Sequence, residues 1–133
     1  MTNKDLKNIL YAEDESDIRE IAQIALEDIG GFIVTYCSNG REAVEKAKDI
    51  QPDLILLDVM MPEMDGPTTL KALRKIPYYS SLPVIFMTAK IQPDEIAKYK
   101  EMGALDVISK PFDPMTLADS IMKIWERYLE TCQ

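Results

Sequence analysis

The feature of this 133-residue sequence that most constrains its fold is a fivefold alternation of short apolar runs with longer amphipathic stretches. The apolar runs are rich in β-branched and aromatic residues, which favours strands, and the longer stretches carry apolar residues at helical spacing. Strands separated by helices pair in parallel through right-handed crossovers. The alternation therefore predicts an α/β fold with a doubly wound five-stranded parallel sheet and five helices.

The predicted strands are short, and the third is apolar on both faces, as expected for a central strand covered by helices on each side. Strands are predicted at residues 8–12, 32–37, 54–57, 83–88 and 105–109. Helices are predicted at residues 16–29, 39–50, 65–75, 93–102 and 113–129.

Capping residues set the expected ends of these helices. Ser38 is the expected N-cap of the second helix, Asp65 and Pro67 open the third, and Asp113 with Pro114 opens the fifth. Glycine residues end the first and the fourth helix. The apolar face of the first helix is predicted to hold Ile18, Ile21, Ala22, Ala25 and Ile29.

Length and charge limit the class of protein. The length fits one domain, residues 1–133, and 47% hydrophobic residues suffice for a core without a disulfide or a metal. The net charge of −8 disfavours direct binding to nucleic acid or to an anionic membrane, because those surfaces reward clusters of basic residues. No apolar run is long enough to cross a bilayer, and the polar N-terminus holds no signal segment.

Cysteine and histidine usage narrows the chemistry. Cys37 and Cys132 have no metal-site spacing, so we expect a reduced, cytoplasmic protein. Histidine is absent, which excludes histidine metal ligands, serine–histidine–aspartate triads and histidine acid–base catalysis.

Polar side chains stand at the carboxyl ends of four predicted strands: Glu13 and Asp14 after the first, Asp58 after the third, Thr88 at the fourth and Lys110 after the fifth. Ligands of doubly wound sheets bind at this edge. Clustered carboxylates repel one another, and Mg2+ is the natural compensation because it prefers oxygen ligands. Asp58 follows a buried strand and suits an aspartyl nucleophile, while Lys110 and Thr88 would contact phosphoryl oxygens.

Each of these residues also has a purely structural explanation. Glu13 and Asp14 could cap the first helix, and Asp58 could be a loop residue. Thr88 could be a structural hydroxyl, and Lys110 could be a solvated lysine. Their joint occurrence at successive strand ends favours a shared site.

Four segments at these strand ends resemble the receiver domains of bacterial two-component systems, and the resemblance covers nearly the whole chain. The segments are Glu13-Asp14, Asp58-Val59-Met60-Met61-Pro62-Glu63-Met64-Asp65-Gly66, Met87-Thr88-Ala89 and Lys110-Pro111-Phe112. The resemblance implies a single receiver domain over residues 1–133 with the flavodoxin-like strand order 2-1-3-4-5.

The resemblance also implies roles for the acidic residues. Asp58 would accept a phosphoryl group from a histidine kinase or a histidine phosphotransfer protein. Asp14, Asp58 and the Met60 backbone carbonyl would bind Mg2+, and Glu13 would hold a metal-bound water. The domain would assist only its own phosphorylation and dephosphorylation, so we do not expect an enzyme with a separate substrate.

The remaining segments contribute smaller features by the same resemblance. Thr88 and Lys110 would contact the phosphoryl oxygens, Ala89 would leave the acceptor accessible, and the bond before Pro111 is often cis in the family. One departure is Val107, which stands where the family often has a switch aromatic. Val107 has no ring to move inward, so it has less surface to exchange between two states. Two further positions that tune phosphoryl lifetime in the family are Met60 and Lys90.

We expect phosphorylation to bias a two-state equilibrium and to change the face formed by the fourth helix, the fifth strand and the fifth helix, including Ile96, Tyr99 and Val107. The sequence ends directly after the last predicted helix, so we expect action through an unidentified partner protein rather than a fused output domain. We expect a monomer, with dimerisation after phosphorylation as the alternative.

Three other functions are alternatives. A phosphohydrolase of the haloacid-dehalogenase type also uses an aspartyl nucleophile, but it needs a second acid two residues later, where Met60 stands. A nucleotide-binding module would carry a glycine-rich phosphate loop, and neither common pattern occurs. A degenerate receiver would bind partners without phosphorylation; Val107 favours it, and the four intact segments argue against it.

Overall fold

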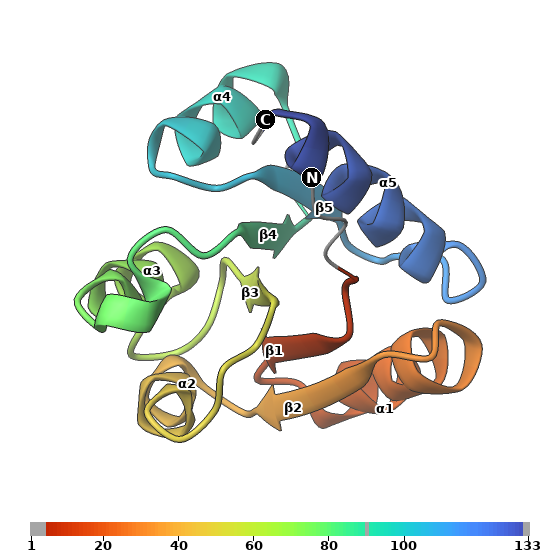
Figure 1. Ribbon diagram of the computed structural model, residues 1–133, viewed down its shortest axis with the longest axis horizontal. Helices are drawn as coiled ribbons and strands as arrows, with labels where there is room; N and C mark the ends of the chain where they lie inside the picture. The colour runs from red at the N-terminus through yellow and green to blue at the C-terminus, as the bar shows by residue number, and fades with distance from the viewer. Residues whose placement is uncertain (1–4, 90, 132–133) are drawn as a thin grey trace.

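The computed structural model describes residues 5–89 and 91–131 and confirms the predicted strands and helices (Figure 1). Five parallel strands form one sheet in the order β2-β1-β3-β4-β5, as expected. The strands are β1 (Asn8–Ala12), β2 (Ile33–Cys37), β3 (Leu54–Asp58), β4 (Val84–Thr88) and β5 (Asp106–Ser109).

Helices cover both faces of the sheet. In Figure 1, α1 and α5 lie on one face, and α2, α3 and α4 lie on the other. The helical elements are α1 (Ser16–Gln23), η1 (Ile24–Ile29), α2 (Gly40–Ala47), α3 (Gly66–Arg74), η2 (Pro77–Tyr79), α4 (Pro93–Glu101) and α5 (Leu117–Thr131). Within the described ranges, no helix is long and apolar enough to span a membrane.

The sheet separates two apolar cores. One lies between the sheet and the helical layer of α1, η1 and α5, and it includes Tyr11, Leu56 and Trp125. The other lies under α2, α3 and α4, and it includes Leu57 and Phe86. Every residue of β3 and β4 is buried, which is the pattern expected of central parallel strands.

The first helix reaches Ile29 as predicted, but its second half is a π-helix, η1. Gly30 donates its amide to the carbonyl of Ala25, five residues earlier, instead of four. Two residues of the expected apolar face are wrong, because Ile21 and Ile29 are exposed. Ile29 lies in the π-helix, whose wider turn shifts the helical register, whereas Ile21 precedes it. The register shift buries Leu26 on the core side.

The expected N-cap of the second helix is wrong. Asn39 is the N-cap, and its side chain accepts the amide of Glu42 at 2.7 Å. Ser38 donates its own amide and hydroxyl to the Glu42 carboxylate, at 2.5 and 3.1 Å. Asn39 directly precedes the first helical residue, so its short side chain reaches the free amide, and Glu42 reaches back one residue further. The helix ends at Ala47 rather than near residue 50.

The fifth helix starts at Leu117, later than the predicted start at Asp113. The Asp113 carbonyl accepts the amides of Thr116 and Leu117, and its carboxylate accepts the amide of Met115. Asp113 therefore organises a turn that leads into the helix instead of opening the helix itself. The N-cap of the third helix is confirmed, since Asp65 accepts the amide of Thr68 at 2.8 Å.

One arginine joins the loops at the amino ends of β4 and β5. Arg74 donates through Nη1 to the carbonyls of Tyr79 and Leu82, at 2.8 and 2.7 Å, and through Nη2 to the carbonyl of Gly103 at 3.4 Å. The 3-10 helix η2, which the sequence did not predict, is one of the segments held in this way. This contact lies at the edge of the sheet opposite the predicted site.

Candidate functional site

Three carboxylates meet where β1 and β3 end. Glu13 and Asp14 follow β1, and Asp58 is the last residue of β3, its neighbour in the sheet. Carboxylate oxygens of all three residues lie within 4.8 Å of one another. Glu13 and Asp58 are buried, and Asp14 is half-buried. The parallel register brings these side chains together because both strands end at the same edge.

Lys110 is the cation of this cluster. It follows β5, and its Nζ lies 2.9 Å from Oε1 of Glu13 and 3.1 Å from Oδ2 of Asp58. Its side chain is only 14% exposed, so both ion pairs are largely shielded from water. Lys110 therefore lies against both buried carboxylates, as expected from the positions of these residues at the strand ends.

The cluster formed by Glu13, Asp14, Asp58 and Lys110 carries more negative than positive charge when its acids are ionised. Burial raises the pKa of Glu13 to about 7, opposed by the hydrogen bond from Lys110 and assisted by the charge of Asp58. Burial also raises the pKa of Asp58, although Lys110 works against it. Burial lowers the pKa of Lys110, but its bonds to Glu13 and Asp58 outweigh this, and the net shift is upward. Among the described residues, Lys110 pairs with Glu13 and Asp58 while Asp14 adds a third acid, and a divalent cation would balance the excess negative charge.

Thr88 and the loop after β4 form the next part of the site. Thr88 ends β4 and is buried, and its backbone carbonyl accepts the amide of Lys110 at 2.9 Å. Val59, directly after Asp58, donates its amide to the carbonyl of Met87 at 2.9 Å. These two backbone bonds tie the segments that carry Asp58, Thr88 and Lys110 to one another.

The loop from β3 to α3 passes close to Asp58. A Cβ on Gly66 would lie 2.7 Å from the Asp58 carbonyl oxygen, so only glycine fits there. Glu63 has a φ of 67°, in the left-handed region, beside a bond of 2.7 Å from the Met64 amide to the Pro62 carbonyl. This tight turn shapes the rim of the site.

Met60 lies in the same loop and is 70% exposed. The carbonyl of Met60 as a metal ligand stays a prediction. Lys90, the other expected tuning position, lies outside the described residues, as does Cys132.

Arg19 is a site-adjacent residue that the sequence analysis missed. Its Nη1 donates to the Glu13 carbonyl at 2.6 Å, so α1 is bonded to the segment that carries Glu13 and Asp14. The Glu13 side chain also accepts the amide of Glu15 at 3.2 Å. A signal was present: Arg19 is the single basic residue between Lys7 and Arg41.

An apolar hollow of about 280 Å³ opens beside the carboxylate cluster. The bond between Lys110 and Pro111 at its edge is cis. The hollow is lined by Ile18, Ile21, Ala89, Lys110, Pro111 and Phe112. The hollow forms an apolar surface next to the site, on the side of α1.

Val107, at the expected switch position, is half-buried in β5 and packs against the core that includes Phe86. The Tyr99 ring of α4 contacts Phe86 edge-on, with centroids 5.4 Å apart at 84°. The large ring on this side of the site is therefore supplied by α4 and not by β5.

A buried carboxylate, a lysine and a hydroxyl at one sheet edge can hold a divalent cation and stabilise a group with several negative oxygens. The donor set of the three acids fits a hard cation such as Mg2+, because all the side-chain ligands are oxygens.

Comparisons with known proteins agree with this geometry. The family model described as response regulator receiver domain matches residues 9–122. The transcriptional regulatory protein CseB of Streptomyces coelicolor is 36% identical over 124 residues, which cover 93% of this chain and 51% of CseB. The response regulator Rre1 of Synechocystis is 37% identical over 121 residues, which cover 90% of this chain and 52% of Rre1. The chain thus spans about half the length of these curated relatives.

Solved structures show the same similarity. The chemotaxis response regulator CheY4 of Vibrio cholerae superposes with a TM-score of 0.82 at 32% identity, and the match covers 90% of this chain and 99% of CheY4. The receiver domain of a signal transduction histidine kinase from Syntrophus aciditrophicus matches with a TM-score of 0.75 at 36% identity, over 89% of each chain.

Proposed function

Because the chain belongs to the response regulator receiver family, whose members are phosphoacceptor signalling domains of two-component systems, we propose that Asp58 is its phosphoacceptor. The observation that carries the proposal is the pairing of Lys110 Nζ with Asp58 Oδ2 at 3.1 Å inside a cluster of three acids. A lysine that already contacts the nucleophile is close enough to contact the oxygens of the incoming phosphoryl group as well.

The chemistry assigns one task to each side chain. An Asp58 carboxylate oxygen forms the new bond to phosphorus, while the bond from phosphorus to the donor nitrogen breaks and its electron pair returns to the donor imidazole. Lys110 moves its charge onto the transferred group, and the Thr88 hydroxyl donates to one of its oxygens. Positioning and charge stabilisation suffice, so we assign no turnover of a separate substrate.

Asp14, Asp58 and the Met60 carbonyl would hold Mg2+, with Glu13 acting through a metal-bound water. When bound, Mg2+ neutralises charge on the carboxylates and on the phosphoryl oxygens. The fit rests on the three clustered carboxylates, which one lysine leaves undercompensated.

We assign the donor to a histidine kinase or a histidine phosphotransfer protein. Asp58 is 2% exposed, so the donor has to seat its imidazole deep at the sheet edge. The apolar hollow that Ile18, Ile21 and Phe112 help to line supports docking of a protein surface there. The proposal also includes an unidentified output partner and a cytoplasmic location. It further includes a monomeric state, with dimerisation after phosphorylation as the alternative.

We further propose that residues 1–133 act as one receiver unit whose output face is formed by α4, β5 and α5. Ile96, Tyr99 and Val107 are half-buried there, which suits side chains that exchange between two packings. If amide shifts caused by beryllofluoride stay within the Asp58 loop, this output face is refuted.

The test is the intact mass of the protein after incubation with acetyl phosphate, with and without Mg2+, beside Asp58→Asn. We expect one added phosphoryl group that requires Mg2+ and is absent in the variant. Asp53→Asn is the matched control, because it changes an acid of the same strand region away from the cluster, and it should still be phosphorylated.

Beryllofluoride binding covers the case in which hydrolysis outruns detection. Mg2+-dependent binding that is lost in Asp58→Asn supports the proposal. Neither adduct nor binding would instead favour the degenerate receiver that acts without phosphorylation. Phosphate release from a generic phosphomonoester, lost in Asp58→Asn, would favour the phosphohydrolase alternative.

A further inference from the structure

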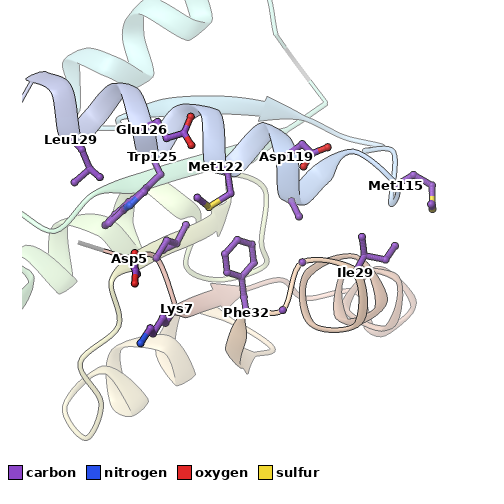
Figure 2. A pocket seen from close by; sticks show the side chains of 14 residues that line it. Asp5, Lys7, Ile29, Phe32, Met115, Asp119, Met122, Trp125, Glu126 and Leu129 are labelled. Atoms are coloured by element: carbon purple, nitrogen blue, oxygen red, sulfur yellow. The ribbon is translucent and has the colours of Figure 1, made fainter. Parts of the chain in front are cut away.

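A groove of about 740 Å³ runs along α5, on the side that faces η1 and the segment before β1 (Figure 2). Figure 2 shows Phe32 pointing into it from below and Met122 and Trp125 pointing into it from α5. Phe32 and Trp125 are buried, so they form an apolar floor. The groove lies on the other flank of α5 from the α4–β5–α5 face and is separate from the Asp58 cluster.

Two features of the backbone shape one side of the groove. The π-helix turns Ile29 outward, where it is 45% exposed at the rim. A Cβ on Gly30 would lie 2.8 Å from the Ala118 Cβ, so no side chain fits between η1 and α5 at that point. The close approach at Gly30 and Ala118 anchors one part of the groove, while larger side chains border the rest.

The wall supplied by α5 and the turn before it has a heptad pattern in the sequence. Met115, Met122 and Leu129 are spaced by seven residues, and Asp119 and Glu126 fall between them with the same spacing. All five line the groove, which confirms that this stripe faces it. Apolar and acidic side chains therefore alternate from the turn before α5, which carries Met115, along about three and a half turns of the helix.

The charge of the groove is one-sided. Asp5, Asp119 and Glu126 are its acids, and Lys7 is the one base among the residues that line it. Asp119 and Glu126 are exposed, and the ion pairs found among the described residues do not include them. A surface on which apolar side chains alternate with unpaired carboxylates is complementary to a partner on which apolar side chains alternate with basic ones.

We propose that this groove binds a basic amphipathic helix of a partner protein, with apolar side chains at heptad spacing and Lys or Arg between them. The helical part of this wall, from residue 117 to residue 129, is about 18 Å long, and the turn that carries Met115 extends it, so a helix of about 15 residues covers the wall. A second copy of this chain is a poor occupant, because it would oppose the same acids and carries the same net charge of −8.

The probe is a synthetic peptide of about 15 residues with leucine at every seventh position, lysine four residues after each leucine, and alanine or glutamine elsewhere. Titration into the full 15N-labelled chain should give saturable amide shifts along α5 and at Gly31 and Phe32. The same peptide with glutamate in place of each lysine should bind at least about tenfold more weakly.

Charge reversal in the protein provides the decisive comparison. Asp119→Lys/Glu126→Lys should weaken the lysine peptide about tenfold and strengthen the glutamate peptide. Glu45→Lys/Glu101→Lys is the matched control, since it changes net charge equally at exposed sites elsewhere and should leave the preference unchanged. Asp119→Asn/Glu126→Gln, which is milder for folding, should remove the preference without inverting it.

Several results would overturn the proposal. Equal binding of both peptides would mean that charge does not select the occupant. Shifts centred on Glu13, Asp14 and Asp58 would show that the peptide is attracted to the carboxylate cluster. Dimerisation of the chain alone, abolished by Asp119→Lys/Glu126→Lys, would make a second copy the occupant. Binding that appears only after removal of residues 1–4 would assign the groove to the chain's own N-terminus.

Discussion

The body of β3 and its carboxyl end are equally buried, but opposite forces act on them. Residues 54–57 are apolar and fully buried between two helical layers, so burial itself stabilises them. Asp58 is 2% exposed and carries a carboxylate next to two others, so burial opposes its charge. The comparison teaches that one strand can hold both stabilising and costly burial, one residue apart.

The largest expected effect is in the body of the strand. Leu56→Ala should lower the free energy of unfolding by about 4 kcal/mol, because a fully buried leucine leaves a cavity that central strands cannot close. Urea unfolding followed by circular dichroism measures this loss. A loss below about 1 kcal/mol would mean that the body is not the stabilising half of the comparison.

The next effect tests the carboxyl end. Lys110→Met should lower the free energy of unfolding by about 3 kcal/mol at pH 8 without Mg2+, since it leaves Glu13 and Asp58 buried without their cation. The loss should shrink at pH 5, where the raised pKa of Glu13 lets it be neutral. A loss in the Glu13→Gln/Asp58→Asn background as large as in the native background would assign it to packing.

The pH dependence of the unmodified chain sharpens the contrast further. The Glu13 pKa rises from 4.5 to about 7 on folding, so the folded state holds the proton more tightly across that interval. Stability without Mg2+ should therefore fall between pH 5 and pH 8, by about 2 kcal/mol. Glu13→Gln should flatten the curve, and a stability that rises over this interval would contradict the assignment.

Added Mg2+ should oppose this trend, because its carboxylate ligands bind it in their charged form. Thermal unfolding at pH 5 and pH 8, with and without Mg2+, measures the difference. The increase in melting temperature should be larger at pH 8, and an equal increase at both pH values would argue against these carboxylates as the ligands.

The smallest effect concerns an ion pair in water near the same site. Arg41 and Glu63 are 3.8 Å apart with side chains about 80% exposed. Arg41→Ala should change the free energy of unfolding by less than about 0.5 kcal/mol, because solvent screens such pairs. A double-mutant cycle with Glu63→Ala gives the coupling. A coupling as large as that of Lys110 with Glu13 would remove burial as the explanation of the contrast.

The sequence was sufficient to predict the features that depend on the alternation of apolar and amphipathic segments and on the residues at the strand ends. The strands and the meeting of Asp14, Asp58 and Lys110 at one edge were predicted, because parallel strands place their carboxyl ends together. The strand order was implied by the resemblance to receiver domains. The strands and their shared edge follow from the hydrophobic pattern and from the alternation of strands with helices, both of which can be read directly from the sequence.

What the sequence did not predict depends on local geometry. The apolar residues of the first helix fit regular α-helical spacing, so the π-helical turn and the outward position of Ile29 carried no signal in the sequence. Ser38 and Asn39 are both good N-caps, and the choice between them depends on where the strand before them ends. The contact of Arg19 with the Glu13 carbonyl joins a side chain to a backbone atom, which residue types alone do not specify.

Arg74 has a consequence for how the protein opens. Its guanidinium bonds the carbonyls of Tyr79, Leu82 and Gly103, so the segments leading into β4 and β5 share one donor. Those segments should exchange their amide hydrogens as one cooperative unit instead of fraying separately. Arg74→Lys replaces two separated donor nitrogens with a single ammonium, and we expect it to split that unit into two segments with different exchange rates.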